Sequence, residues 1–314
     1  MYNPLNVGNE GWELLFNSIE KTVQRTSKLK NGPLFWLLPA LIVLLCITMF
    51  PFFYSIFLSV MNYDISKPYL ARIFVGLRNY AQALTNPRSL NSFKVTAMFV
   101  TISVSIQSLL GLGIALVMQK LSKWRTLFIG LVIVPMLLPK MIVGLLWRIM
   151  YHPLVGIVNY LLGYFLNVHY VEWLSDPSLA LLSVIAVDVW QWTPFMILIL
   201  SAGLEMMPKS PFEAAQLDGA NGFQTFWRIT LPLLKPIYIV AFIFRLIEDM
   251  RTFDIMWVMT AGGPGTKTET VDIYAYLVGM SRGGKISYAS SISILLMVFT
   301  IVVLTIVTKR VKEN

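Results

Sequence analysis

Cysteine and histidine are both scarce in this sequence. Cys46 is the only cysteine, so the chain cannot form an internal disulfide, and a thiolate metal site is not expected. The two histidines, His152 and His169, do not have the spacing of metal ligands. We therefore expect neither disulfide nor metal chemistry in this chain.

Charge is scarce as well. Only 13% of the 314 residues are charged, whereas soluble domains carry about 25%. Hydrophobic residues make up 56% of the chain, and the mean hydropathy is +0.68. Runs of the roughly 20 apolar residues that span a bilayer are Leu34–Val60, Val95–Met118, Leu127–Met150, Leu179–Leu204, Leu233–Val258 and Ile286–Thr308. These runs predict an all-α, polytopic membrane protein with six transmembrane helices.

The net charge of +9 comes from Lys and Arg in loops and at the ends of the apolar runs. This scatter indicates residues that flank membrane spans rather than a nucleic-acid surface, which would gather them in one stripe. Six spans put both termini on one side. Placing that side in the cytoplasm gives the cytoplasmic segments more Lys and Arg than the outer ones, as the positive-inside rule requires. We expect cytoplasmic termini and a cytoplasmic 205–232 loop.

Two further segments have helical character. Apolar residues recur at helical spacing between Trp12 and Val23, with charged residues opposite, which predicts an amphipathic helix on the membrane surface or against a partner. Val155–Val168 is apolar but too short to span, so we expect an interfacial helix on the outer side.

A polar stretch, Glu213–Pro232, separates the fourth and fifth runs. Ser210-Pro211-Phe212-Glu213 has the pattern of a capping box with proline at the first helical position, and predicts a short helix from Pro211 to about Asp218. Gly219 permits a turn, and Asn221–Gln224 offers a weaker box for a second helix. The residues alone leave two interpretations open: a loop packed on its own bundle, or a helix that docks in a groove of another protein.

This stretch resembles a family motif. Glu213-Ala214-Ala215, Gly219, Ile229 and Leu231-Pro232 match every spaced position of the "EAA" loop of binding-protein-dependent ABC importer permeases. "WQWTPFMILILSAGLEMMP" before the loop and "MTAGGPGTKTETVDIYAY" after the fifth run are similar to the sugar-permease branch, of the maltose-type first permease. The resemblance covers roughly Leu34–Lys309. The departures are the N-terminal extension, "RLIEDMRTFD" and "SRGGKISYAS".

The resemblance implies the type I importer permease fold in a bacterial inner membrane. Its parts would be a cytoplasmic amphipathic extension (1–32), a transmembrane permease domain (33–310) with the coupling loop 205–232, and a cytoplasmic tail (311–314). The implied partners are a second homologous permease, two ATPase subunits, an external solute-binding protein and the lipid membrane. The implied ATPase-coupling residues are Glu213, Ala214, Ala215, Asp218, Gly219, Ile229, Leu231 and Pro232.

The sequence lacks a phosphate-binding loop of its own. "GGPGTKT" at 262–268 and "GGKIS" at 283–287 both depart from the required Gly-Lys-Ser/Thr ending. We therefore expect no cofactor and no catalytic residue in this chain, with ATP and Mg²⁺ held by the partner ATPase.

Polar residues inside the fourth and fifth runs are candidates for the solute path, because each buried charge costs about 2.5–3.5 kcal/mol. They are Asp188, Gln191, Trp192, Arg245, Glu248 and Asp249. Carboxylates and amides beside indoles suit carbohydrate.

A purely structural interpretation of these charges also stands. Arg245–Asp249 and Glu248–Arg251 have the spacing to pair within one helix. Asp188 would then pair with Lys140 or Arg148 of the third run. A cation left over from this pairing would favour an acidic solute.

The predicted function is ATP-driven import of neutral or mildly acidic sugars or oligosaccharides, with a polyol or glycerol phosphate as the alternative solute. An ion-coupled secondary transporter is the rival class, but the sequence shows no inverted repeat. An intramembrane enzyme would need a His-Glu-x-x-His pattern or a nucleophile–base pair, and the sequence has neither.

Overall fold

The computed structural model describes residues 32–67, 72–119, 125–168, 170–281 and 283–312, and the amphipathic helix expected at Trp12–Val23 lies outside these residues. The chain divides into two compact units, 1–57 and 58–314. Helix α2 (Gly32–Ser59) contains every described residue of the first unit. It contains Cys46, which is exposed and free.

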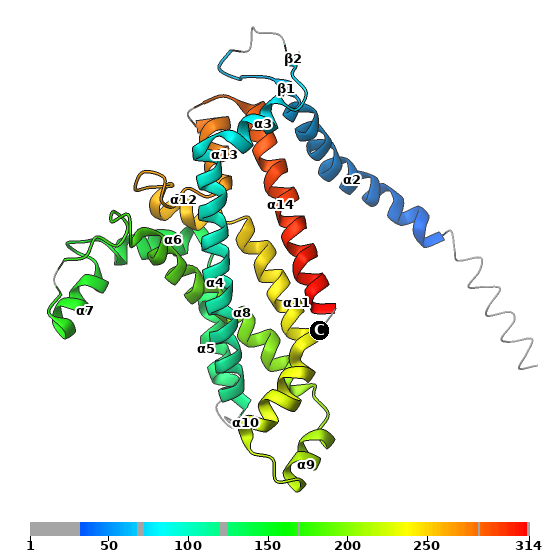
Figure 1. The fold of residues 1–314 in the computed structure, drawn as a ribbon, viewed down its shortest axis with the longest axis vertical. Coiled ribbons are helices and arrows are strands. Elements are labelled where there is room, and N and C mark those ends of the chain that lie inside the picture. The colour runs from blue at the N-terminus through cyan, green and yellow to red at the C-terminus, as the bar shows by residue number, and fades with distance from the viewer. Residues whose placement is uncertain (1–31, 68–71, 120–124, 169, 282, 313–314) are drawn as a thin grey trace, which may run out of the picture. The chain divides into compact units, whose positions relative to one another are not determined.

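The second unit is helical apart from one short antiparallel pair of strands (Figure 1). Its elements before the fourth span are β1 (Met61–Asn62), β2 (Ile73–Phe74), α3 (Arg78–Thr85), α4 (Pro87–Gln119), α5 (Arg125–Leu137), α6 (Lys140–Met150) and α7 (Ile157–Leu166). Those that follow are α8 (Ala180–Glu205), α9 (Ser210–Leu217), α10 (Gly222–Thr225), η1 (Phe226–Thr230), α11 (Leu231–Met250), α12 (Asp254–Thr260), α13 (Val271–Tyr276), η2 (Leu277–Ser281) and α14 (Ile286–Lys312).

Five helical stretches among the described residues are long and apolar enough to cross a membrane, and the bent pair α5–α6 makes a sixth candidate. The all-α, polytopic fold class is thus confirmed, and the protein is a multi-pass membrane protein. Helix α7 has ten residues and is too short to span. Its placement at the membrane surface stays a prediction.

The third span, expected over Leu127–Met150, consists of the two helices α5 and α6 rather than one. It bends by 92° between Leu137 and Lys140, where Pro135 and Pro139 remove backbone donors. Gln191 Nε2 of α8 donates to the Leu138 carbonyl at 2.9 Å, which satisfies an acceptor that the break exposes. A break inside a membrane protein is tolerated when neighbouring helices satisfy the freed backbone in this way.

Helices α4, α8 and α11 pack together and form the centre of the second unit. Gly111 of α4 sets how closely α4 and α8 approach, because a Cβ atom there would lie only 2.4 Å from Met196 Cβ. Small residues at helix contacts allow the helices to approach closely. In lipid, where the hydrophobic effect does not drive helices together, the van der Waals contacts made at this short distance stabilise the packing. Helix α12 packs against α6 and α8, so the hydrophobic core includes contacts with the second half of the broken third span.

The fifth span differs from the predicted Leu233–Val258. The continuous helical stretch starts at Gly222, passes through the π-helical η1, and ends at Met250. A turn follows in which Arg251 N donates to Glu248 O and Thr252 N donates to Asp249 O. Residues after the turn form the separate α12. Pro232 lies inside the long helix, because that stretch already begins at Gly222.

Candidate functional site

The EAA loop forms a helix–turn–helix, but its first cap differs from the prediction. Helix α9 begins at Ser210 itself, and neither Ser210 nor Lys209 makes a side-chain capping bond. The predicted box at Ser210 is therefore wrong, because the serine lies inside the first turn. The weaker box is the one that forms: Asn221 Oδ1 accepts from Gln224 N, and Gln224 Oε1 accepts from Asn221 N, both at 2.9 Å.

Helix α9 presents a mixed surface. Ala215 is buried, whereas Glu213, Ala214 and Asp218 are exposed. Leu217 is also exposed, with 90% of its surface accessible. Gly219 follows with φ +73°, a backbone conformation that strains any side chain but glycine, and it ends the helix. The loop therefore exposes one leucine, Leu217, and two carboxylates, Glu213 and Asp218, on a helix that ends abruptly.

The rest of the motif lies on the helix that leads into the fifth span. Ile229 belongs to η1, and Leu231 and Pro232 start α11. Ile229 and Leu231 are half-buried, and Pro232 is exposed. The motif thus links the exposed α9 to α11 through one continuous helix.

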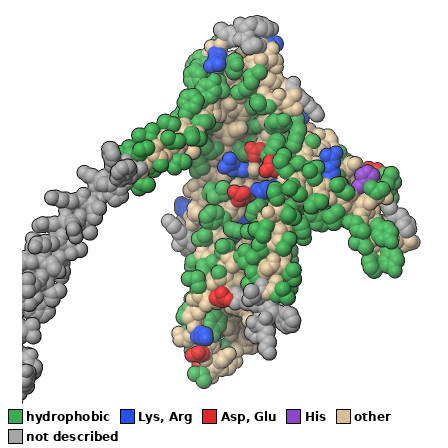
Figure 2. Space-filling view, turned by 180° about the vertical axis from the view of Figure 1, so that it is seen from behind, with side chains coloured by type: hydrophobic (Ala, Val, Ile, Leu, Met, Phe, Trp, Pro, Cys, Tyr) green, Lys and Arg blue, Asp and Glu red, His purple; other side chains and the backbone are tan. Residues whose placement is uncertain are grey.

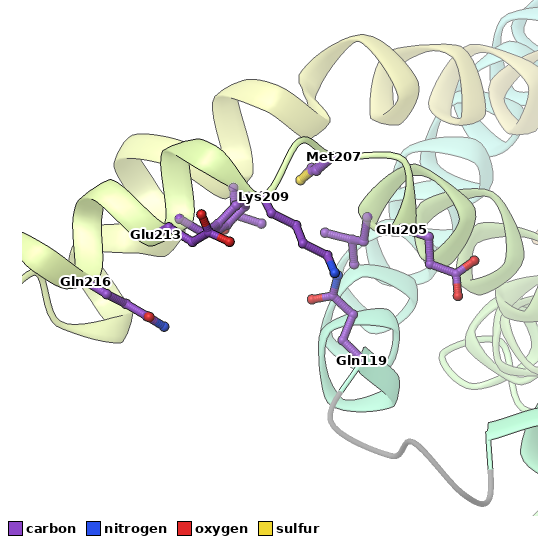
Figure 3. Close-up of a pocket in the computed structure, with 9 residues that line it drawn as sticks. Gln119, Glu205, Met207, Lys209, Glu213 and Gln216 are labelled. Atoms are coloured by element: carbon purple, nitrogen blue, oxygen red, sulfur yellow. The ribbon is translucent and has the colours of Figure 1, made fainter.

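A cleft of about 380 Å³ lies between α9 and the ends of two spans (Figure 3). Lys209, Glu213 and Gln216 line it from the α9 side, and Gln119 and Glu205 line it from the ends of α4 and α8. Figure 3 shows the Lys209 side chain reaching across toward Gln119. The cleft separates α9 from the ends of α4 and α8.

A buried ion network lies between α4, α8 and α11; we call its members Ser103, Gln107, Asp188, Arg245 and Asp249 the Arg245 cluster. Asp188 Oδ2 accepts from Ser103 Oγ at 2.9 Å, Gln107 Nε2 at 2.7 Å and Arg245 Nη2 at 3.4 Å. Arg245 Nε donates to Gln107 Oε1 at 2.8 Å, and Nη2 also pairs with Asp249. Every charged member is 1–2% exposed.

The cluster shows which of the predicted ion pairs form. Pairing of Arg245 with Asp249 inside one helix is confirmed. Pairing of Asp188 with Lys140 or Arg148 is wrong, because Arg245 is its cation. Sequence reasoning missed the two α4 members, although Ser103 and Gln107 stand four residues apart in an apolar run and share one helix face.

A second layer of charge lies beside the cluster and is more exposed. Lys140 Nζ is 3.3 Å from Glu248 Oε2, with side chains 22% and 57% exposed. Trp192 joins the two layers, since its ring centroid lies 5.1 Å from Lys140 Nζ and 4.7 Å from Arg245 Cζ. The predicted Glu248–Arg251 pair is not formed, because Glu248 turns to the third span instead. Figure 2 shows basic and acidic side chains gathered at mid-height on a largely hydrophobic face.

Four buried polar atoms around these layers have no hydrogen-bond partner among the described residues: Gln191 Oε1, Trp192 Nε1, Arg245 Nη1 and Asp249 Oδ2. Two of them are donors and two are acceptors. Buried polar groups normally have partners, so this set is suited to water or to hydroxyl groups. The described residues hold no group of three His, Cys, Asp or Glu that could bind a metal ion.

Comparison with known proteins identifies the family. Residues 107–313 match the model of the binding-protein-dependent transport system inner membrane component. The chain is 39% identical to the trehalose/maltose transport system permease protein MalF of Thermococcus litoralis, over 90% of this chain and 96% of that protein. It is 31% identical to the trehalose transport system permease protein SugA of Mycobacterium tuberculosis, over 82% and 81% of the two chains.

A solved structure supports the same fold. A chain of a bacterial ABC transporter involved in the import of the acidic polysaccharide alginate superimposes with a TM-score of 0.76 and 21% identity, over 92% of this chain and 99% of that one. Family, fold and spans thus agree. This chain belongs to the family of binding-protein-dependent transport system inner membrane components and is a multi-pass membrane permease.

Proposed function

We propose that this chain is one permease subunit of an ABC importer for sugars or oligosaccharides. The observation that carries the proposal is the 39% sequence identity, over 90% of this chain, to a trehalose/maltose transport system permease protein. In this proposal an external solute-binding protein delivers the saccharide, a second permease completes the path, and two ATPase subunits bind ATP and Mg²⁺. The membrane is the bacterial inner membrane, with both termini in the cytoplasm.

Helix α9 is the proposed contact with the ATPase. Its exposed Leu217 and Glu213 give it an apolar anchor and a charge for a groove on a partner, a common mode of helix recognition. Gly219 ends the helix, and the continuous helix from Gly222 to Met250 connects the loop to the Arg245 cluster. Movement of α9 by the ATPase is thereby transmitted along α11 to the centre of the membrane.

The solute path is proposed to pass the Lys140–Glu248 pair. Asp188, Arg245 and Asp249 are buried in this conformation, and Gln191 is buried as well. Lys140 and Glu248 retain access to the surface. We propose that separation of this pair opens Trp192 and the unpartnered polar atoms to saccharide hydroxyls, which supply both donors and acceptors.

The coupling role is tested in the assembled transporter reconstituted with its ATPase and binding protein. Glu213→Lys or Gly219→Asp is expected to weaken ATPase association and saccharide uptake while the permease still inserts and folds. Gly222→Ala is the matched control, because a Cβ at Gly222 meets open space and its backbone is ordinary. Uptake at the wild-type level in the Glu213→Lys, Gly219→Asp double variant would contradict the proposal.

The orientation is tested by thiol labelling in a Cys46→Ala background, which has no other thiol. Gln216→Cys, on α9, should react with a membrane-impermeant maleimide only after the membrane is opened. Lys267→Cys should react in intact cells. The reverse pattern would overturn the assigned topology.

A further inference from the structure

A second cleft, of about 460 Å³, lies where α6, the 174–175 loop and the end of α12 meet. We call it the Tyr151 cleft. Its polar lining residues include Arg148, Tyr151, His152, Ser175 and Thr260. The volume falls within the roughly 300–1,000 Å³ of small-molecule sites. The proposed topology places this cleft on the outer side.

Tyr151 is the most informative residue of the cleft. It is 6% exposed, and its ring is held between Trp147 and Trp173, with centroid distances of 5.2 and 5.4 Å. Its hydroxyl has no hydrogen-bond partner among the described residues, although it belongs to a nearly buried side chain that lines the cleft. Burial raises the pKa of Tyr151 to about 12, so the hydroxyl remains a protonated donor at physiological pH.

Two further lining side chains, Arg148 and His152, also offer hydrogen-bond donors. Arg148 Nη1 donates to the Val258 carbonyl at 3.1 Å, and Arg148 has no acidic partner in the part of the chain that the structure describes. His152 Nδ1 accepts from the backbone N–H groups of Leu154 and Val155, at 3.3 and 3.4 Å. This arrangement leaves the imidazole N–H on Nε2, as a donor.

Acidic groups do not compensate these donors. The lining residues include no Asp or Glu. Asp176, next to the lining residue Ser175, is already bonded to Ser178, whose N–H and hydroxyl donate to its Oδ1 at 2.7 and 2.5 Å. A cleft with one uncompensated guanidinium, an imidazole N–H and a phenol favours a ligand that is rich in oxygen acceptors and carries negative charge.

The length of α6 sets the distance between the cleft and the Lys140–Glu248 pair. Helix α6 has eleven residues, so it separates Lys140 from the Tyr151 end by roughly 16 Å at 1.5 Å per residue. Trp147 of α6 packs against Trp190 of α8, with their ring centroids 5.4 Å apart. The cleft and the Lys140–Glu248 pair therefore lie at opposite ends of one short helix.

We propose that the Tyr151 cleft is a binding subsite for a carboxylate-bearing saccharide, with Arg148 pairing with the carboxylate and Tyr151 and His152 donating to ring and hydroxyl oxygens. The subsite rests on the proposed import function and precedes the mid-span path. Arg148, at the end of α6, is the cation that would pair with a charged solute, because Lys140 and Arg245 already have acidic partners.

The experiment measures binding of digalacturonate and of its neutral counterpart, a galactose disaccharide, to the full chain in nanodiscs, by saturation-transfer NMR. The acidic disaccharide is expected to bind about tenfold more tightly, the effect of one charge-assisted contact. Arg148→Gln should abolish this difference, and Tyr151→Phe should weaken both ligands about fivefold. Arg78→Gln, which removes an exposed cation of α3 that does not line the cleft, should leave both affinities unchanged.

Tyr151→Phe removes only an unpartnered hydroxyl, so the variant should fold, and its thermal unfolding is measured alongside. Equal affinities for the two disaccharides, an unchanged preference in Arg148→Gln, or no binding to the wild-type chain would overturn the subsite. Saccharide uptake by the assembled transporter separates the two proposals. Uptake without cleft binding refutes the subsite alone, whereas binding without uptake of any saccharide refutes the import function.

Discussion

Removal of the buried guanidinium of Arg245 is expected to destabilise the protein strongly. In Arg245→Leu, Asp188 and Asp249 stay buried but lose their only cation in the cluster, and Gln107 Oε1 loses a donor. Breaking a buried ion pair from one side costs about 3–5 kcal/mol, because an uncompensated charge remains in a medium of low polarity. We expect the free energy of unfolding to fall by about that amount.

The assay is SDS-induced unfolding of the purified chain in mixed micelles, followed by tryptophan fluorescence and circular dichroism. Lys140→Gln is the matched control, because it also removes a cation with an acidic partner, but that partner, Glu248, is 57% exposed. Exposed pairs contribute about 0–1 kcal/mol, so this variant should unfold close to wild type.

A double variant tests the electrostatic reason directly. Arg245→Leu combined with Asp249→Leu removes the pair as a whole and leaves Asp188 with the donors Ser103 and Gln107. It should be more stable than Arg245→Leu alone, because only one buried carboxylate, Asp188, then lacks a cation instead of two. If Arg245→Leu lost no more stability than Lys140→Gln, the reasoning about the cluster would be refuted.

Three further predictions concern the loop, the helix contact and the outer region. Asn221→Ala should cost about 1 kcal/mol in unfolding free energy and Ser210→Ala almost nothing, because only Asn221 makes a capping bond; equal losses would contradict the assignment. Gly111→Ala should destabilise the α4–α8 contact by about 1–3 kcal/mol, whereas Gly113→Ala, where a Cβ meets open space, should be neutral or slightly stabilising in the same unfolding assay. Burial raises the pKa of Asp272 to about 6, and the nearby charge of Arg251 partly offsets this rise. The contribution of the Asp272 carboxyl to stability is therefore fully present below about pH 4 and is lost as the pH rises through 6. The free energy of unfolding of Asp272→Asn should therefore rise relative to that of the wild type as the pH increases from about 4 to 6, by about 3 kcal/mol at most. Parallel pH profiles of the two proteins would show that this carboxyl does not titrate there.

The sequence by itself determined the class of fold, because membrane spans follow from local composition. A run of about 20 apolar residues must form a helix in lipid wherever it lies in the chain. The EAA spacing likewise indicated the family and the short α9. The turn at Gly219 was predictable for the same reason, since the freedom of glycine is a property of one residue.

Helix ends were less predictable. Ser210 and Asn221 carry similar capping patterns, yet only Asn221 forms its box. The choice depends on where each helix starts relative to the body it packs on. Similarly, Pro135 and Pro139 accompany a 92° break, while α8 continues through Pro194, because the surrounding contacts decide whether a missing donor bends the chain.

Only the tertiary structure decided the partners of the buried charges. Sequence spacing anticipated Arg245 with Asp249, which share one helix, but it placed Asp188 with the third span and Glu248 with Arg251. The structure instead joins Asp188 to Arg245 and Gln107, and Glu248 to Lys140. These pairs lie 57 to 108 residues apart, and their formation depends on the packing and depth of helices that sequence spacing does not contain. A charge at bilayer depth must find a partner, and which partner it finds is set by the neighbouring helix.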